Sequence, residues 1–323
     1  DQADPDQPFF LYLAFNAPHW PLEAKPEILD KYVGRFMGGW DQLMEDRHAR
    51  MVEMGLIDPR LTPASHEGPR WDTLSEQQHH ELDLRMAAYA ACIDSIDENV
   101  GRLVDHLDKI NRRENTLIFF LSDNGSCQEG GNFGSGDEHI IRNPWEGSGT
   151  VGGARLGKAW AIASNSPLRK YKHFVHEGGM NTPLIVHWPN GLNEDTNGEI
   201  VRQYAYLPDI MSTCVELSGA EYPTEYGGHA IPPMEGRSLV AALQGNEGLI
   251  HVDPICWEHE KNRAIRIGDW KLVWAGRGPW ELYDMTYDRG EMNDLSEEMP
   301  DRVAELSAIW RAWADRNGVQ YQD

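Results

Sequence analysis

The sequence predicts an α/β protein in which a mixed, mostly parallel sheet is flanked by helices and followed by a small antiparallel sheet with one helix. Three observations lead to this prediction. Apolar residues recur at helical spacing from about 75 to 110, which indicates a long amphipathic helix. Two short apolar runs, at 116–121 and 183–189, are typical of buried parallel strands. From 254 onward, short strand patterns follow one another at regular spacing.

The first predicted element is a buried strand over residues 9–15, where the sequence is almost entirely apolar. Pro18 and Pro21 follow it and stop regular structure. His19 lies between them, at the carboxyl end of the predicted strand, which is where ligand sites of α/β folds lie. The long helix comes next, with Thr73 and Ser75 as its candidate N-caps.

The middle of the chain, residues 122–179, is rich in Gly, Ser and Asn and has little periodicity. It is too long for a simple connection, so we expect a functional loop region. A helix is predicted over 207–217, where Pro208 suits the first turn and Asp209 suits the positive end of the helix dipole.

The C-terminal part has four strand patterns, at 254–258, 263–267, 270–274 and 280–284. Gly268 and Asp269 suggest a tight hairpin between the middle two. A closing helix is predicted over 300–317. We therefore divide the chain into an α/β core over 1–251 and a small antiparallel subdomain over 252–323.

The charge balance excludes some classes of partner. With 29 Lys+Arg against 52 Asp+Glu the net charge is −23, which disfavours nucleic acid and anionic membrane surfaces. No apolar stretch approaches the roughly 18 residues of a spanning helix, so we expect no membrane span. An anionic substrate would have to be captured by local cations and metal.

Two kinds of candidate site stand out. The turn Ser122-Asp123-Asn124-Gly125 places a carboxylate and an amide oxygen side by side after a predicted strand, which suits a hard cation such as Ca²⁺ or Mg²⁺. The same string is also an ordinary turn sequence. His19 is either a packed histidine or a catalytic one. Lys172 lies in a basic cluster, either as a solvated side chain or as an anion clamp.

Several segments, taken in order, resemble the arylsulfatase family. The matching segments are Phe9-Phe10-Leu11-Tyr12-Leu13 to Ala17-Pro18-His19-Trp20-Pro21, Leu121-Ser122-Asp123-Asn124-Gly125, Pro167-Leu168-Arg169 to Lys172, Glu177-Gly178-Gly179, Pro183-Leu184-Ile185-Val186, Trp257-Glu258-His259-Glu260, Asn262-Arg263-Ala264 and Gly268-Asp269-Trp270-Lys271-Leu272-Val273. The resemblance spans nearly the whole chain, and an ordered series is more specific than any single match. It implies an alkaline-phosphatase-like fold.

The resemblance also implies roles for single residues. Asp123 and Asn124 match the positions of calcium ligands in that family, with Mg²⁺ as the alternative cation. His19 and Lys172 match residues that contact the sulfate group, and His19 is either the proton donor to the leaving group or a sulfate ligand. The implied reaction is hydrolysis of a sulfate monoester by a hydrated formylglycine nucleophile, and the implied substrate is a sulfated small molecule or glycan.

One departure from the family pattern matters. The nucleophile motif Cys/Ser-x-Pro-x-Arg is absent from the sequence, and so is an early Asp-Asp pair that completes the metal site. Both lie upstream of the His19 region in the family, so we expect an N-terminal segment to be missing here and this chain alone to be inactive. The alternatives are a phosphodiesterase or phosphonate-ester hydrolase of the same superfamily and a non-catalytic relative.

Two properties are less constrained. A periplasmic or secreted location is expected from the resemblance more than a cytoplasmic one, while the oligomeric state is not indicated. The aromatic residues, including 12 Trp, suit either a substrate pocket or the core. Trp257 and His259 either reach the mouth of the site or have a structural role.

Overall fold

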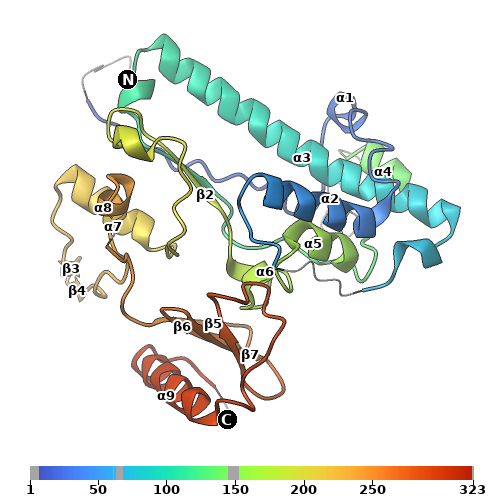
Figure 1. Ribbon diagram of the computed structural model, residues 1–323. Helices are drawn as coiled ribbons and strands as arrows, with labels where there is room; N and C mark the ends of the chain where they lie inside the picture. The colour runs from blue at the N-terminus through green and yellow to red at the C-terminus, as the bar shows by residue number, and fades with distance from the viewer. Residues whose placement is uncertain (1–6, 61, 63–67, 145–152, 247, 322–323) are drawn as a thin grey trace.

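The computed structural model describes the chain except residues 1–6, 61, 63–67, 145–152, 247 and 322–323. The helices are α1 (Pro26–Leu29), α2 (Gly39–Glu53), α3 (Glu76–Lys109), α4 (Glu138–Arg142), α5 (Lys158–Asn165), α6 (Glu177–Met180), α7 (Asp209–Ser218), α8 (Val240–Leu243) and α9 (Pro300–Arg316). The strands are β1 (Ile118–Leu121), β2 (Leu184–His187), β3 (Glu225–Tyr226), β4 (His229–Ala230), β5 (Ile255–His259), β6 (Asn262–Ile267), β7 (Trp270–Ala275) and β8 (Glu281–Asp284). In Figure 1, α3 runs along one side of the molecule and packs against α1 and α4, α2 packs against α5, and α9 lies at the opposite end with the C-terminal sheet.

The long helix α3 forms where its periodicity predicts. Ser75 is its N-cap, and a capping box joins the Ser75 and Gln78 side chains to the backbone N–H of the other residue. Its buried face supports an aromatic cluster in which the Trp40 ring lies 4.9 Å from Trp71 and 5.3 Å from Trp160. α3 is largely polar on its other face, and within the described residues no helix is both long and apolar enough to cross a bilayer.

The predicted core strands are present as β1 and β2, but they pair with each other antiparallel, with Ile118 opposite His187 and Leu121 opposite Leu184. Both strands are half-buried, and Phe120 and Ile185 are exposed. The difference from the expected parallel arrangement has a physical reason. An apolar run indicates that a strand is buried, whereas its direction depends on the connection and on the neighbouring strands.

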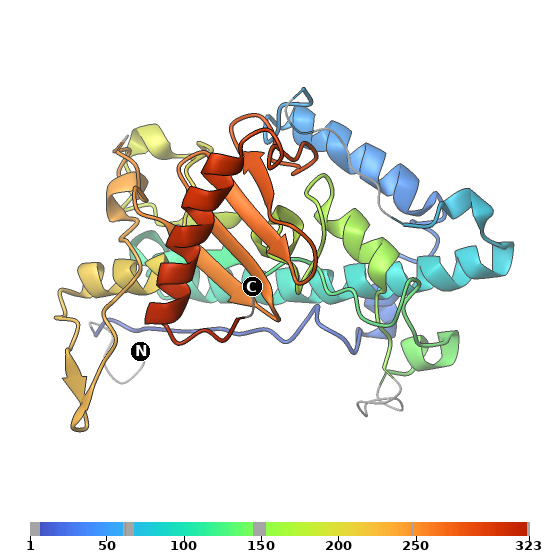
Figure 2. The ribbon, with the colours of Figure 1, turned by 90° about the horizontal axis from the view of Figure 1, so that it is seen from below.

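Residues 9–15 do not form the predicted buried strand. The segment is extended along one side of the molecule (Figure 2), forms no ladder with the described strands, and is solvent-exposed. Phe10 and Tyr12 are 80% and 82% exposed. An apolar sequence adopts a buried strand only when a neighbour supplies hydrogen bonds and cover, and the described residues supply neither here.

The C-terminal sheet has the order β5-β6-β7-β8, with every pair antiparallel. The predicted hairpin at Gly268-Asp269 is confirmed, because Ile267 pairs with Trp270 and Gly268 adopts a left-handed φ of 55°. α9 packs across one face of the sheet (Figure 2), and Leu306 and Trp310 are fully buried against it. The predicted α/β class with a small antiparallel sheet and a covering helix is therefore confirmed.

Candidate functional site

The Asp123-Asn124 turn directly follows β1. The Ser122 hydroxyl donates to the carbonyl of Asn124 at 2.8 Å, and the Asn124 amide NH₂ donates to the carbonyl of Gly125 at 3.1 Å. Because the NH₂ group of Asn124 donates in this way, its side-chain oxygen remains an acceptor that a cation can use. The carboxylate of Asp123 is exposed beside it. The turn thus presents two hard oxygen donors of the kind that Ca²⁺ prefers.

Close backbone packing joins this turn to the Glu-Gly-Gly segment of α6. The N–H of Gly125 donates to the carbonyl of Gly179 at 2.9 Å. A Cβ on Gly125 would lie 1.9 Å from the carbonyl oxygen of Gly178, so only glycine fits this contact. One residue further on, the carbonyl of Ser126 accepts from the N–H of Lys172 at 3.1 Å. The structure therefore brings Lys172 next to the residues that follow Asp123 and Asn124.

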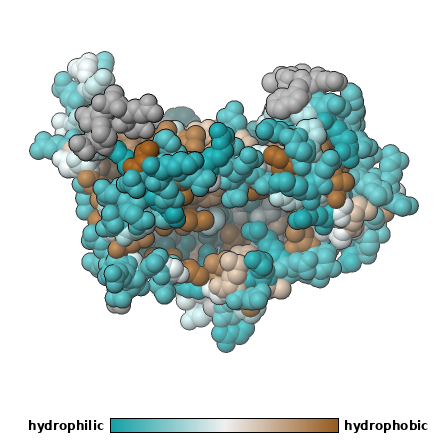
Figure 3. Space-filling model, turned by 90° about the horizontal axis from the view of Figure 1, so that it is seen from above, coloured by the Kyte–Doolittle hydropathy of each residue, from teal (hydrophilic) through white to brown (hydrophobic). Residues whose placement is uncertain are grey.

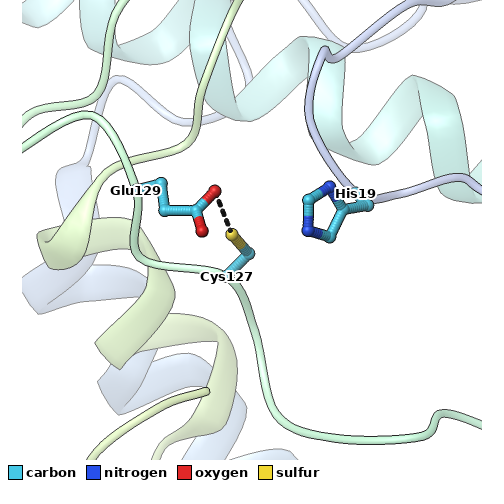
Figure 4. Close-up of side chains that lie close together, drawn as sticks. All are labelled: His19, Cys127 and Glu129. Atoms are coloured by element: carbon cyan, nitrogen blue, oxygen red, sulfur yellow. Dashed lines mark hydrogen bonds between the residues drawn. The ribbon is translucent and has the colours of Figure 1, made fainter. Parts of the chain in front are cut away.

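His19 approaches the same region from the N-terminal segment. Its N–H donates to the carbonyl of Asn16 at 3.0 Å, and its Nδ1 lies 2.9 Å from the carbonyl oxygen of Trp20. Figure 4 shows the exposed imidazole facing Cys127 and Glu129, which come from the glycine-rich loop. One possible ligand atom from each of these three residues lies within 4.8 Å of the other two. His19 and the backbone of Lys172 thus lie against the residues that directly follow Asp123 and Asn124 in the chain.

Cys127 and Glu129 carry no family motif, and the sequence alone did not single them out. The Cys127 thiol donates to Glu129 Oε2 at 3.2 Å (Figure 4). Burial raises the pKa of this thiol, and the Glu129 carboxylate adds to that effect, while a hydrogen bond with the backbone of Glu129 and the positive charge of Lys172 lower it. The net direction is a raised pKa, so the environment of Cys127 favours the thiol over the thiolate.

A further cation lies beside His19. The guanidinium of Arg155 lies 4.2 Å from the centre of the Trp20 ring, and the backbone of Arg155 pairs with Ser135 across the glycine-rich loop. The pairing requires Gly134, where a Cβ would lie 2.1 Å from the carbonyl oxygen of Arg155. The glycines of this loop thus permit the close approach that carries Arg155 to the His19 segment. No sequence spacing reveals this contact.

The segment that carries Lys172 is anchored to the C-terminal sheet by buried charges. Lys271 of β7 is fully buried, and its Nζ lies 2.7 Å from both Glu177 Oε1 and Glu291 Oε1. Burial opposes ionisation of Glu177, but the charges of Lys271 and Arg266 and the hydrogen bonds from Lys271 and Asn181 together outweigh it and lower the pKa of that carboxyl. Burial raises the pKa of Glu291, and Lys271 compensates only in part. The ammonium therefore holds two carboxyl groups of unequal acidity in a dry environment.

A second set of contacts reinforces this anchor. Glu281 of β8 accepts from Tyr283 at 2.6 Å and pairs with Arg169 at 3.0 Å, and His176 Nε2 lies 3.1 Å from the same oxygen. Burial raises the pKa of Glu281, but these hydrogen bonds and charges outweigh burial and bring it to about 2. Arg169 and His176 bracket Lys172 in the chain. Lys172 is therefore held on both sides by the C-terminal sheet.

The surface of the molecule is hydrophilic over most of the face seen in Figure 3, and hydrophobic residues gather around a central hollow in it. Exposed apolar side chains are concentrated in residues 9–15, with Phe120 and Ile185 exposed on the paired strands. Contiguous exposed apolar surface of this kind marks an interaction site in soluble proteins.

Two family models match the chain. A sulfatase model matches residues 1–220, which is more than half of the chain. A model for the C-terminal region of N-sulphoglucosamine sulphohydrolase matches residues 170–308. The two matches overlap over 170–220, the stretch that contains Lys172 and Glu177.

Individual relatives agree with these matches. An uncharacterised sulfatase of Schizosaccharomyces pombe is 32% identical over 342 residues, covering 97% of this chain and 59% of that protein. An arylsulfatase of Klebsiella aerogenes is 30% identical, covering 73% of this chain and 52% of its own length. The solved structure of Ps i-CgsB superposes with a TM-score of 0.61 at 25% identity, covering 95% of this chain and 50% of the other. The chain spans between half and three fifths of the length of these relatives, and it belongs to the sulfatase family of the alkaline-phosphatase-like superfamily.

Proposed function

We propose that this protein hydrolyses sulfate monoesters, with His19, Lys172, Asp123 and Asn124 as the part of the active site that this chain supplies. The observation that carries the proposal is the convergence of these residues. Segments near 19, 123 and 172, far apart in the sequence, meet around Ser126 and Cys127. A cationic side chain, an imidazole and two hard oxygen donors within one site suit the binding of a sulfate group and protonation of its leaving alkoxide.

Each residue has a defined task in this proposal. The Lys172 ammonium binds a sulfuryl oxygen and stabilises the charge that develops on it. The exposed His19 imidazole either donates a proton to the leaving oxygen or binds the sulfate. Asp123 and Asn124 would hold a Ca²⁺ ion, which supplies Lewis-acid polarisation of the sulfuryl group when bound. These two side chains fit that ion, but they provide only two of the about six to eight oxygens that it takes.

The remaining ligands and the nucleophile are proposed to come from a segment that precedes Asp1 in the whole protein. The sequence contains no Cys/Ser-x-Pro-x-Arg motif, so a formylglycine nucleophile would have to be supplied by that segment. Two findings support the proposal. The chain spans about half of its relatives' length, and the apolar residues 9–15 are exposed although they have the sequence of a buried strand. We expect the 323-residue chain alone to release no sulfate.

A sulfated sugar is the proposed substrate class. One similar protein is an N-acetylglucosamine-6-O-sulfatase of Bacteroides thetaiotaomicron, which is 26% identical over 65% of this chain. Ps i-CgsB, which has the same fold, has been solved in complex with k-i-k-neocarrahexaose. The relatives thus favour a saccharide, and an aryl sulfate serves as a general probe. Export to the periplasm or the medium is proposed for the same reason, since polymeric glycans are met outside the cell.

Sulfate release by the full-length protein tests the proposal. Aryl sulfate and sulfated saccharides are supplied with CaCl₂, and a phosphodiester and a phosphonate monoester serve as competing substrates. Lys172→Ala is expected to lower kcat/KM for sulfate release by about 10²-fold or more, as for loss of a group that stabilises transition-state charge. Lys109→Ala, at an exposed position near the end of α3, is the matched control. Preferential hydrolysis of the phosphorus esters, or an active Lys172→Ala variant, would contradict the proposal.

A further inference from the structure

Two histidines and a glutamate from distant parts of the chain meet where the Lys172 segment touches the turn between β5 and β6. His173 follows Lys172, while His259 is the last residue of β5 and Glu260 begins the turn after it. One possible ligand atom from each of the three residues lies within 4.8 Å of the other two. The His173 Nδ1 lies 2.6 Å from Glu260 Oε2, and the His173 and His259 rings are stacked with their centres 6.0 Å apart. The cluster is separate from the Asp123-Asn124 turn in its residues and in its donor atoms.

The backbone beneath this cluster is fixed by one buried side chain. The Asn262 amide donates to the carbonyl of His173 at 2.8 Å and to the carbonyl of His259 at 3.0 Å. His259 pairs with Asn262 across the hairpin, so Glu260 and Lys261 form a two-residue turn with φ of 50° and 72°. Positive φ at both positions is typical of a type I′ turn. The three side chains are therefore presented from a backbone that is held in place.

We propose that His173, His259 and Glu260 bind a borderline transition-metal cation, with Zn²⁺ as the reference ion. Two imidazole nitrogens and one carboxylate oxygen suit Zn²⁺ and related cations, whereas Ca²⁺ prefers a shell of oxygens alone. In a tetrahedral zinc site with bonds of about 2.0–2.1 Å, ligand atoms lie roughly 3.3 Å apart. Closing the observed cluster therefore needs side-chain movements of roughly 1–1.5 Å, which rotation of the exposed His259 and Glu260 provides.

A second carboxylate contacts His173 on the other side of its ring. Glu129 Oε1 lies 3.7 Å from His173 Nε2, which is the ring nitrogen facing away from Glu260, so this carboxylate can orient the His173 ring while a water molecule completes the coordination. The cation would then join two segments, the one after Lys172 and the β5-β6 hairpin. Binding displaces the proton from any protonated imidazole, so zinc affinity is expected to rise with pH up to neutrality. This inference is independent of the proposed hydrolytic activity.

Isothermal titration with ZnCl₂ tests the proposal on full-length, untagged protein that has been stripped of metal and then saturated with CaCl₂. The calcium occupies oxygen-only sites, and the absence of an affinity tag removes foreign histidines. One zinc site per chain is expected from these three residues, with a rise in Tm because the cation binds the folded state. His259→Ala and Glu260→Gln are each expected to weaken zinc binding by about 10-fold or more, since loss even of a residue that supports a ligand weakens binding about 10–100-fold. His80→Ala, on the exposed face of α3, should leave it unchanged.

A second titration separates this cluster from the other one. Cys127→Ser removes a donor from the group His19, Cys127 and Glu129, and it should not change the affinity of the proposed site. With CoCl₂ as the probe, the proposed nitrogen-oxygen site gives ligand-field bands without a thiolate-to-cobalt charge-transfer band. The proposal is overturned if wild type binds no zinc, if His259→Ala binds like wild type, or if only Cys127→Ser abolishes binding and the cobalt spectrum shows thiolate ligation. None of these readouts depends on sulfate release.

Discussion

Replacing the buried lysine of the C-terminal sheet should destabilise the protein strongly. Lys271→Met keeps most of the length of the side chain and removes its charge. The ammonium lies 2.7 Å from carboxyl oxygens of both Glu177 and Glu291, and all three side chains are at least 97% buried. Removing one partner of a buried ion pair leaves an uncompensated charge and costs about 3–5 kcal/mol. We expect a loss of that size in the free energy of unfolding.

Equilibrium urea unfolding, followed by far-UV circular dichroism, measures this loss at pH 7. Lys109→Met is the matched control, because Lys109 is exposed near the end of α3 and such surface changes stay within about 0.5 kcal/mol. The triple variant Lys271→Met, Glu177→Gln, Glu291→Gln should recover most of the loss, since no buried charge then lacks a partner. A loss below about 1 kcal/mol in Lys271→Met would refute the reasoning, because it would mean that water or another cation reaches the carboxylates.

Three further predictions concern single contacts. Gly125→Ala forces a Cβ to 1.9 Å from a backbone oxygen, so thermal unfolding should show a loss of about 1–3 kcal/mol in the free energy of unfolding. Gly101→Ala, in open space on α3, should instead raise the free energy of unfolding by about 0.5–1 kcal/mol. Equal effects of the two substitutions would contradict the packing argument. Ser75→Ala removes the capping box of α3 and should cost about 1 kcal/mol in urea unfolding, and a neutral result would mean that the cap is dispensable. The folded-state pKa of Glu281 is depressed to about 2, so its contribution to stability is present above its ordinary pKa of 4.5 and is lost as the pH falls towards 2. Glu281→Gln should therefore flatten the fall in the urea midpoint between about pH 5 and 3. An unchanged pH dependence of the midpoint would argue against this role of Glu281.

The sequence predicts those elements whose signal is local. α3 was predictable from its apolar spacing and its Ser75 cap, and the β6-β7 hairpin from Gly268 and Asp269. The direction of the core strands was not predictable, because β1 and β2 pair across more than 60 residues and their apolar runs contain no information on direction. The prediction of a buried strand over 9–15 was wrong for a related reason. Its burial depends on cover from outside itself, which no property of the segment encodes.

Some residues of the candidate site were likewise predictable from local sequence, and others were not. His19, Lys172, Asp123 and Asn124 could be named because each lies in a string that resembles a family motif. Arg155, Cys127 and Glu129 could not, since their neighbours are set by close packing of a glycine-rich loop. The position of Lys271 was equally hidden from sequence reasoning. A lysine between Trp270 and Leu272 suggests a solvated strand position, whereas Lys271 is fully buried and pairs with two carboxyl groups from other segments.

The buried charges also bear on why the C-terminal sheet belongs to the proposed active site. Well-packed apolar residues often match or exceed the stability of a buried ion cluster, so stability alone does not account for Lys271. What the cluster does is fix Glu177, five residues after Lys172, to a defined point on β7, while Arg169 is fixed to Glu281 on β8. If this positioning is its role, the neutral triple variant should regain stability without regaining a low KM for the sulfate ester. Recovery of both properties together would show that the ion cluster serves the fold alone and that Lys172 is positioned by its own backbone contact with Ser126.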